Sequence, residues 1–203
     1  LLALSLLPVV MMILLSLKSN VEIITDFWSW PNSIRWDNYP AAFATVATST
    51  LNSLFVALVS CAGILLLSSL TGFVFARHKF PGKELLFSLL IALIMLPQVL
   101  LLVPLFIEIK SMGLDNSYWA LILPYLSGGQ LIGILLCRGF FSTIPREFFE
   151  SARIDGASEF QIYGRIVLPL SLPILTTIAI INFHAIYNDF IWPLMVIQHQ
   201  DLK

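Results

Sequence analysis

The stretch EFFESARIDGASEFQIYGRIVLP, residues 147–169, is a compact polar segment between two long apolar runs. The chain has 203 residues, of which 58% are hydrophobic and only 11% are charged. That composition is typical of a protein whose solvent is a lipid bilayer. Six charged side chains nevertheless gather in this one segment: Glu147, Glu150, Arg153, Asp155, Glu159 and Arg165. The segment therefore predicts an element outside the hydrocarbon, placed between two membrane-spanning helices.

Five runs without Asp, Glu, Lys or Arg predict the spans. Each is close to the roughly 20 residues with which a helix crosses ~30 Å of hydrocarbon. The runs are residues 1–17, 54–76, 85–107, 116–137 and 166–188. Helices buried in a soluble protein would show a polar face, and a signal peptide would be followed by a small-residue cleavage site. We therefore predict an all-α, polytopic transmembrane bundle with five spans.

The basic residues divide unequally between the two sets of connections. Seven of the eleven Lys and Arg residues lie in segments 77–84 and 138–165, whereas the other connections hold Lys18, Arg35, Lys110 and Lys203. Cytoplasmic loops are enriched in Lys and Arg, so these two segments are expected to face the cytoplasm. The chain would then start inside and finish outside, which implies sequence missing at both ends.

Residues 145–154 have the pattern of a short helix. Proline suits the first turn, where its missing N–H is not needed, and Phe148, Phe149 and Ala152 are expected on one side. Gly156 can adopt the left-handed conformation that closes a helix C-terminus. A first short helix is therefore expected to end at this glycine.

A second short helix is predicted directly afterwards. Ser158 followed by Gln161 matches a capping box, and Pro169 with Pro173 opens the next span. An amphipathic helix lying on lipid headgroups is the alternative, but its polar face would be mainly basic, whereas this segment mixes both charges. Exposed phenylalanines within a charged rim suit a protein partner better. These residues by themselves predict a cytoplasmic docking element.

The docking element resembles a known family motif. ESARIDGA at 150–157, followed by IVLP at 166–169, is similar to the EAA loop of ABC importer permeases, with Ser151 in place of an alanine. Four further stretches resemble carbohydrate-type, maltose permease-like members: DNYPAAF (37–43), NS (52–53), ARHKFPGK (76–83) and YNDFIWPL (187–194). In the last stretch Tyr187 stands where the family usually has tryptophan.

The resemblance implies an architecture and a set of partners. Residues 1–203 would be an incomplete ABC transmembrane domain that lacks a sixth span, with a cytoplasmic coupling loop at 138–169. The implied location is the inner membrane of a bacterium or archaeon. The implied partners are cytoplasmic ATP-binding subunits, a second permease subunit in a heterodimer, and an extracytoplasmic solute-binding protein, together with membrane lipid and without nucleic acid.

The resemblance also implies residues that couple the chain to the ATPase. These are Phe148, Phe149, Glu150, Ser151, Ala152, Arg153, Asp155, Gly156, Ala157 and Pro169. We hypothesise that Glu150 and Arg153 contact the rim of a cleft on the ATPase while the apolar residues fill it. The alternative is that Glu150 and Arg153 pair with each other at i, i+3.

Catalysis by this chain is not expected. A phosphate-binding loop around Gly82-Lys83 would need a glycine at the position of Arg77 and Ser or Thr at the position of Glu84. The sequence contains no arrangement suggestive of a catalytic triad and no cluster of metal ligands. ATP and Mg²⁺ are therefore expected in the partner ATPase, and no cofactor or metal in this chain.

The solute path is predicted from polar and helix-breaking residues within the spans. Pro97 and Pro104 are expected to bend the third span beside Gln98, and the glycines of the fourth span, Gly128, Gly129 and Gly133, either line a path or allow close packing. In the fifth span His184, Tyr187 and Asn188 share one face at i, i+3 and i+4. With Gln98 they are the candidates for a sugar path, and hydrogen bonding between helices is the alternative role. Asp189 and Trp192 are expected near the outer surface, as caps, anchors or binding-protein contacts.

The function that follows is translocation of a sugar or related polyol, driven by ATP hydrolysis in a separate subunit. An ion-coupled secondary transporter is the alternative, although it would be expected to carry a charged side chain within a span. A membrane-embedded enzyme would gather several titratable groups at one depth, which these runs do not do.

Overall fold

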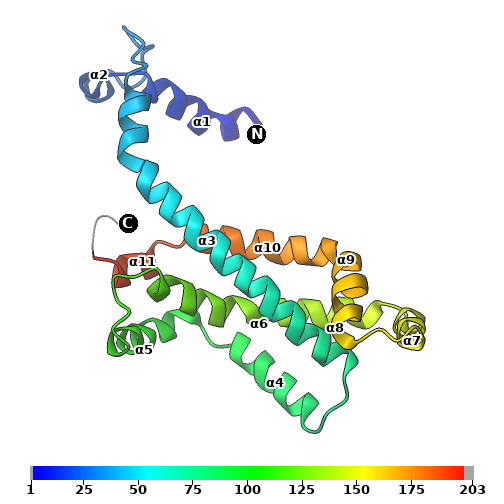
Figure 1. The fold of residues 1–203 in the computed structure, drawn as a ribbon. Helices are drawn as coiled ribbons and strands as arrows, with labels where there is room; N and C mark the ends of the chain where they lie inside the picture. The colour runs from blue at the N-terminus through cyan, green and yellow to red at the C-terminus, as the bar shows by residue number, and fades with distance from the viewer. Residues whose placement is uncertain (1, 199–203) are drawn as a thin grey trace. The chain divides into compact units, whose positions relative to one another are not determined.

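The structure is a computed structural model that describes residues 2–198; Leu1 and residues 199–203, including Lys203, lie outside the described residues. Within residues 2–198 the chain forms helices and connecting segments without a β-strand. It divides into two compact units, Leu1–Leu51 and Asn52–Lys203. The predicted all-helical class is confirmed (Figure 1).

The first unit contains α1 (Leu2–Ser16), α2 (Asn20–Thr25) and the beginning of α3 (Asn38–Arg77). The connection after α1 folds around Lys18, whose Nζ donates hydrogen bonds to the carbonyls of Asp26 at 2.8 Å and Phe27 at 3.2 Å. A capping box of Ser19 and Glu22 starts α2, and the backbone hydrogen bond from Ser19 lowers the pKa of Glu22. The connection between α1 and α3 therefore contains a helix of its own.

The predicted second span is longer than its hydrophobic run suggested. α3 has 40 residues and begins at Asn38, whereas the prediction placed the start at residue 54. Residues 38–53 also lack charged side chains and contain mostly small residues, so nothing interrupts the helix there. At 1.5 Å per residue α3 is about 60 Å long, roughly twice the thickness of the hydrocarbon.

The predicted third span is two helices in the structure. α4 (Lys83–Ile94) and α5 (Gln98–Ser111) meet at an angle of 98°. The break falls at Pro97, as predicted, because proline lacks an N–H and disfavours helical geometry in the preceding residue. Pro104 lies inside α5 without ending it, so the bend expected there stays a prediction. The bend opens a gap in helical hydrogen bonding directly beside Gln98.

The remaining helices complete the second unit. They are α6 (Trp119–Thr143), α7 (Arg146–Ile154), α8 (Glu159–Ile162), the π-helical segment η1 (Tyr163–Val167), α9 (Leu168–Leu170), α10 (Leu172–Tyr187) and α11 (Ile191–Val196). The helical stretch from α8 to α9 meets α10 at 75°, with Ser171 at the corner (Figure 1).

The number of spans is confirmed only in part. Among the described residues, α3 and α6 are long and apolar enough to cross a membrane, and the two bent pairs bring the total to four if each is one span. The apolar helix α1 is shorter, so its role as a span stays a prediction.

Glycines allow α6 to pack closely between α3 and α10. A Cβ atom on Gly133 would lie 2.6 Å from the Cβ of Ser68 in α3, and one on Gly129 would lie 2.6 Å from Oδ1 of Asn182 in α10. Small residues commonly bring membrane helices together in this way. Gly133 therefore serves packing, whereas Gly129 packs against its neighbours and also lines a cavity together with Gly128.

Candidate coupling helix and polar cavity

The helix α7 is closed at its C-terminus by Gly156. This glycine has φ +79°, and its N–H donates to the carbonyl of Arg153 at 3.0 Å. The N–H of Ala157 donates to the carbonyl of Ala152 at 2.9 Å. This pair of bonds is a Schellman motif, which satisfies carbonyls that the helix end would leave free. The predicted helix and its predicted stop are both confirmed.

The two phenylalanines of α7 lie on different sides of the helix. Phe149 is only 3% exposed, whereas its neighbour Phe148 is 49% exposed. Successive residues of an α-helix are about 100° apart, so adjacent side chains do not share a face. The expectation that Phe148 and Phe149 point the same way is therefore wrong.

Phe149 fixes α7 to the end of α3. The guanidinium carbon of Arg77 lies 4.1 Å from the centre of the Phe149 ring, and the ring of Phe73 stacks at 6.5 Å. Arg77 also donates hydrogen bonds to the carbonyls of Phe141 and Ile144, at the end of α6. One arginine thus holds together the ends of α3 and α6 and the buried face of α7.

Phe148, Ser151 and Asp155 are exposed on one side of α7, whereas Glu150, about 200° from Phe148 around the helix, is exposed on another side. Arg153 does not pair with Glu150; its guanidinium binds the Glu159 carboxylate at 3.0 Å. The alternative that Glu150 and Arg153 pair with each other at i, i+3 is therefore wrong. Because Arg153 ties α7 to the start of α8, Glu150 is left exposed and without an ion pair within residues 2–198.

The second short helix begins as predicted. The Ser158 hydroxyl accepts from the N–H of Gln161 at 3.3 Å, and the Gln161 side chain accepts from the N–H of Ser158 at 2.8 Å. Further along, the hydroxyl of Tyr163 lies 2.7 Å from that of Ser69 in α3. Pro169 lies within α9, just before the corner at Ser171. The segment is therefore joined to α3 at several points along its length.

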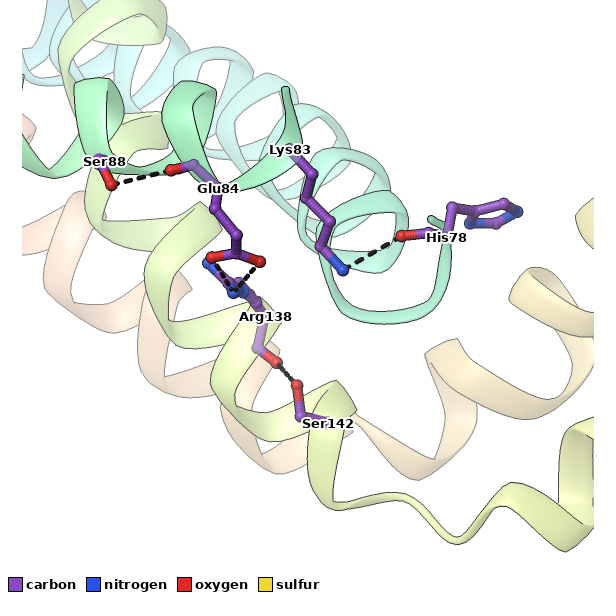
Figure 2. Close-up of polar contacts among 6 residues, drawn as sticks. All are labelled: His78, Lys83, Glu84, Ser88, Arg138 and Ser142. Atoms are coloured by element: carbon purple, nitrogen blue, oxygen red, sulfur yellow. Dashed lines mark hydrogen bonds and ion pairs between the residues drawn. The ribbon is translucent and has the colours of Figure 1, made fainter. Parts of the chain in front are cut away.

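The connection between α3 and α4 provides a further set of polar links (Figure 2). Nζ of Lys83 donates to the carbonyl of His78 at 3.1 Å. In a contact not drawn in Figure 2, Nε2 of His78 lies 3.5 Å from the Glu159 carboxylate. Arg138 of α6 binds both carboxylate oxygens of Glu84 at 3.2 Å. The two basic segments predicted to face the cytoplasm, 77–84 and 138–165, thus lie at the same end of the second unit.

A cavity of about 340 Å³ lies among α5, α6 and α10, away from these charges. Its wall is mainly apolar, with four polar side chains, Gln98, Tyr125, Asn182 and Asp189. The hydroxyl of Tyr125 donates to Asp189 at 2.9 Å. Asn182 is buried, and its Nδ2 donates to the carbonyl of Ile178 at 2.9 Å. A mostly apolar hollow with a few convergent polar groups is typical of a small-molecule site.

The predicted path residues reach this cavity unequally. Gln98 lines it, but His184 and Asn188 are exposed and do not, and the amide of Asn188 donates to the His184 carbonyl of its own helix end at 2.8 Å. Tyr187 stacks on Phe183 with ring centres 5.6 Å apart and lines a smaller adjoining hollow of about 70 Å³. His184, Tyr187 and Asn188 therefore share one face in the last turn of α10 but do not line one cavity.

Two cavity residues were missed, Tyr125 and Asn182. Asn182 is a polar residue within an apolar run. Polar residues in a span tend to face cavities or partners, so the sequence alone indicates this position. Asp189 has a structural role as well, because its Oδ1 accepts from the N–H groups of Ile191 and Trp192 at the start of α11. Trp192 is buried and donates to the carbonyl of Ala120, so it is a packing residue and not a surface anchor.

Comparisons with known proteins address the family. Residues 65–203, more than half of the chain, match the family described as binding-protein-dependent transport system inner membrane component. A probable ABC transporter permease protein of Bacillus subtilis, YurM, is 32% identical over 197 residues, covering 97% of this chain and 66% of the relative. The diacetylchitobiose uptake system permease protein NgcG of Streptomyces coelicolor is 31% identical over 196 residues, covering 96% of this chain and 65% of the relative.

A solved structure gives the same fold. The crystal structure of a bacterial ABC transporter involved in the import of the acidic polysaccharide alginate matches with a TM-score of 0.80 at 21% identity, over 98% of this chain and 70% of the matched chain. The chain is therefore an inner membrane permease of the binding-protein-dependent ABC transporter family. It spans about two thirds of the length of the first two relatives. The resemblance inferred from the EAA-like loop is confirmed.

Proposed function

We propose that this chain is a translocation subunit of an ATP-driven importer for a sugar, oligosaccharide or related polyol. The observation that carries the proposal is the rigid attachment of α7 at one end of the bundle, with an exposed outer face and a buried inner face. Relatives named for diacetylchitobiose, galactooligosaccharides and trehalose support the substrate class. The family implies cytoplasmic ATPase and solute-binding protein partners.

In this proposal the described helices are part of a larger membrane domain. α1, α3, the α4–α5 pair, α6 and the α9–α10 region supply five spans, and a sixth span and a second permease subunit complete the assembly. Residues 138–169 are the coupling loop. ATP and Mg²⁺ bind the partner ATPase subunits, because the chain itself contributes transport and no ATP hydrolysis.

The coupling step follows from the contacts of α7. The exposed residues Phe148, Glu150 and Ser151 meet a cleft on the ATPase, and closure of that cleft moves α7. Phe149 passes the displacement to Arg77 and thus to the ends of α3 and α6. Arg153, through Glu159, passes it to the connection after α3. A flexible attachment would absorb such a displacement, whereas packed helices move as rigid bodies.

The solute step uses the polar cavity. Hydroxyl groups of a sugar both donate and accept hydrogen bonds, which the amides of Gln98 and Asn182 and the hydroxyl of Tyr125 can match. The break at Pro97 places Gln98 at the start of α5, so movement of α4 against α5 changes this wall of the cavity.

The proposal is tested by the accessibility of α7. Glu150→Cys in the full-length subunit is expected to react with a membrane-impermeant maleimide in inside-out vesicles only, and to be protected when the ATPase subunits are added back. Asn32→Cys is the matched control and should react only in right-side-out vesicles. The unmodified chain gives the background, since Cys61 and Cys137 are both buried. Labelling of Glu150→Cys from the outside would overturn the coupling role.

The substrate class is tested separately. The full-length subunit, expressed with the subunits encoded beside it, is reconstituted and its ATP hydrolysis is measured with a panel of neutral oligosaccharides, polyols, amino acids and peptides. Stimulation by saccharides or polyols supports the proposal, and stimulation by amino acids or peptides alone contradicts it.

A further inference from the structure

A second hollow lies at the charged end of the bundle, between the end of α3, the connection to α4 and the helix α7. Its volume is about 340 Å³, and five basic side chains line it: Arg77, Lys79, Lys83, Arg146 and Arg153. His78 and one carboxylate, that of Glu150, also contribute to the wall. The hollow brings together basic residues that are far apart in the sequence.

Most of these positive charges have no carboxylate partner. Arg153 is neutralised by Glu159 at 3.0 Å, but Arg77, Lys79, Lys83 and Arg146 form no ion pair within residues 2–198. Arg77 and Lys83 donate only to backbone carbonyls, which carry no net charge. A concave site lined by one sign of charge concentrates field and attracts the opposite ion.

Arg77 also carries a hydrogen-bond donor without a partner. Its Nε is buried and has no hydrogen-bond partner in the described structure. Buried donors are nearly always paired, by protein, by water or by a ligand. Arg77 itself lines the hollow, so the residue with this unpaired donor is one of those with an uncompensated charge.

The position of the hollow along the helices selects the kind of anion. Arg77 is the last residue of the long apolar helix α3, and Lys83 is the first residue of α4. α3 is longer than the hydrocarbon is thick, but its apolar run of residues 54–76 ends directly before Arg77, and a residue that follows such a run lies near the depth of the lipid phosphates. Basic pockets between membrane helices bind anionic headgroups. Ala76 and Phe149 add an apolar part to the wall, which a free inorganic anion would not need.

The general enrichment of basic residues on one side of a membrane does not account for this arrangement. Arg165 lies in the same basic segment but is exposed and does not line the hollow. Convergence of Arg77, Lys79, Lys83 and Arg146 on one cavity needs the ends of three helices to meet there. We propose that this hollow binds the phosphate of an anionic phospholipid and so braces α7 against the α3–α4 connection.

The test compares lipid retention by the assembled, full-length transporter. The complex is exchanged into nanodiscs containing phosphatidylglycerol and phosphatidylcholine, released into detergent, and analysed by native mass spectrometry. For Lys79→Gln/Arg146→Gln we expect the amount of retained phosphatidylglycerol to fall about tenfold or more. Each basic residue near a charged lipid surface contributes about a factor of five to binding. Lys110→Gln/Arg165→Gln removes the same charge elsewhere and should retain the lipid.

Further arms decide the outcome without reference to transport. Lys79→Arg/Arg146→Lys keeps both charges and should retain phosphatidylglycerol, which separates lost binding from lost folding. Equal retention by the Gln variant and the parent would overturn the proposal. Binding of inorganic phosphate without selective lipid retention would also overturn it. If the Gln variant lost the ATPase subunit while lipid retention stayed unchanged, the hollow would be assigned to an acidic surface of that partner, and the proposal would again be overturned.

Discussion

The coupling end and the polar cavity both place polar groups in an apolar chain, but they are built differently. At the coupling end, formed by α7, α8 and the segment 77–84, the caps and the Arg153–Glu159 ion pair join residues near one another in the sequence. The His78–Glu159 pair and the Arg77–Phe149 contact join residues far apart in the sequence. In the cavity, Gln98, Tyr125 and Asn182 come from three helices and meet only through packing. The turn between α7 and α8 is therefore fixed by local contacts, whereas the polar groups of the cavity meet only through tertiary packing.

The largest expected effect is at Gly156. Proline fixes φ near −65° and has no N–H, so Gly156→Pro removes both the left-handed conformation at φ +79° and the hydrogen bond to Arg153. We expect solute-stimulated ATP hydrolysis by the assembled transporter to fall on the order of tenfold or more towards the basal rate. Gly156→Ala should have a smaller effect, because left-handed alanine costs about 1–2 kcal/mol.

A matched control is Gly164→Ala. A Cβ atom would meet nothing within 4 Å at either glycine, but Gly164 has no positive φ. Gly164→Ala should leave the stimulated rate unchanged. If Gly156→Pro retained full stimulation, the distinction between a locally fixed coupling end and a packed cavity would fail.

The difference between the two regions also explains what the sequence could predict. Gly156, the Ser158–Gln161 capping box and the break at Pro97 are local effects of backbone geometry, and all three were predicted correctly. The face of α7 was not, because Phe149 is drawn inward by Arg77, which precedes it by 72 positions. A short helical pattern does not say which of two adjacent phenylalanines is buried.

The cavity was predictable only in part. Gln98 was identified because it follows the proline break, a local signal. Tyr125 was not predicted because its partner, Asp189, lies in the connection between α10 and α11, and no sequence pattern links the two residues. His184 and Asn188 share a helical face but are exposed, because periodicity gives a direction relative to the helix axis and not the position of the neighbouring helix.

A smaller effect is expected in the cavity. Tyr125→Phe removes the hydroxyl that donates to Asp189 at 2.9 Å, and a hydrogen bond to a charged group contributes about 1.5–3 kcal/mol. Part of that loss is replaced by solvent in an open cavity, so we expect the KM for the stimulating solute to rise about 3–10-fold, with a smaller change in maximal rate.

Tyr163→Phe is the matched control for this prediction. It also loses one hydroxyl contact, at 2.7 Å to Ser69, but it lies at the coupling end. Its effect should appear in the maximal stimulated rate and not in KM. Identical effects of the two variants on KM would show that the two regions do not have separate roles.

The smallest effect is expected at Glu159, which pairs with both Arg153 and His78. These side chains are 38–48% exposed, so each pair is screened by solvent and contributes at most about 1 kcal/mol. Glu159→Gln should lower solute-stimulated hydrolysis about twofold while basal hydrolysis and KM stay the same, because Phe149 and Arg77 still connect α7 to α3. Glu147→Gln, an exposed carboxylate without an ion pair within residues 2–198, serves as the control and should change neither rate. A loss as large as that of Gly156→Pro would mean that the ion pairs, and not the packed phenylalanine, carry the movement.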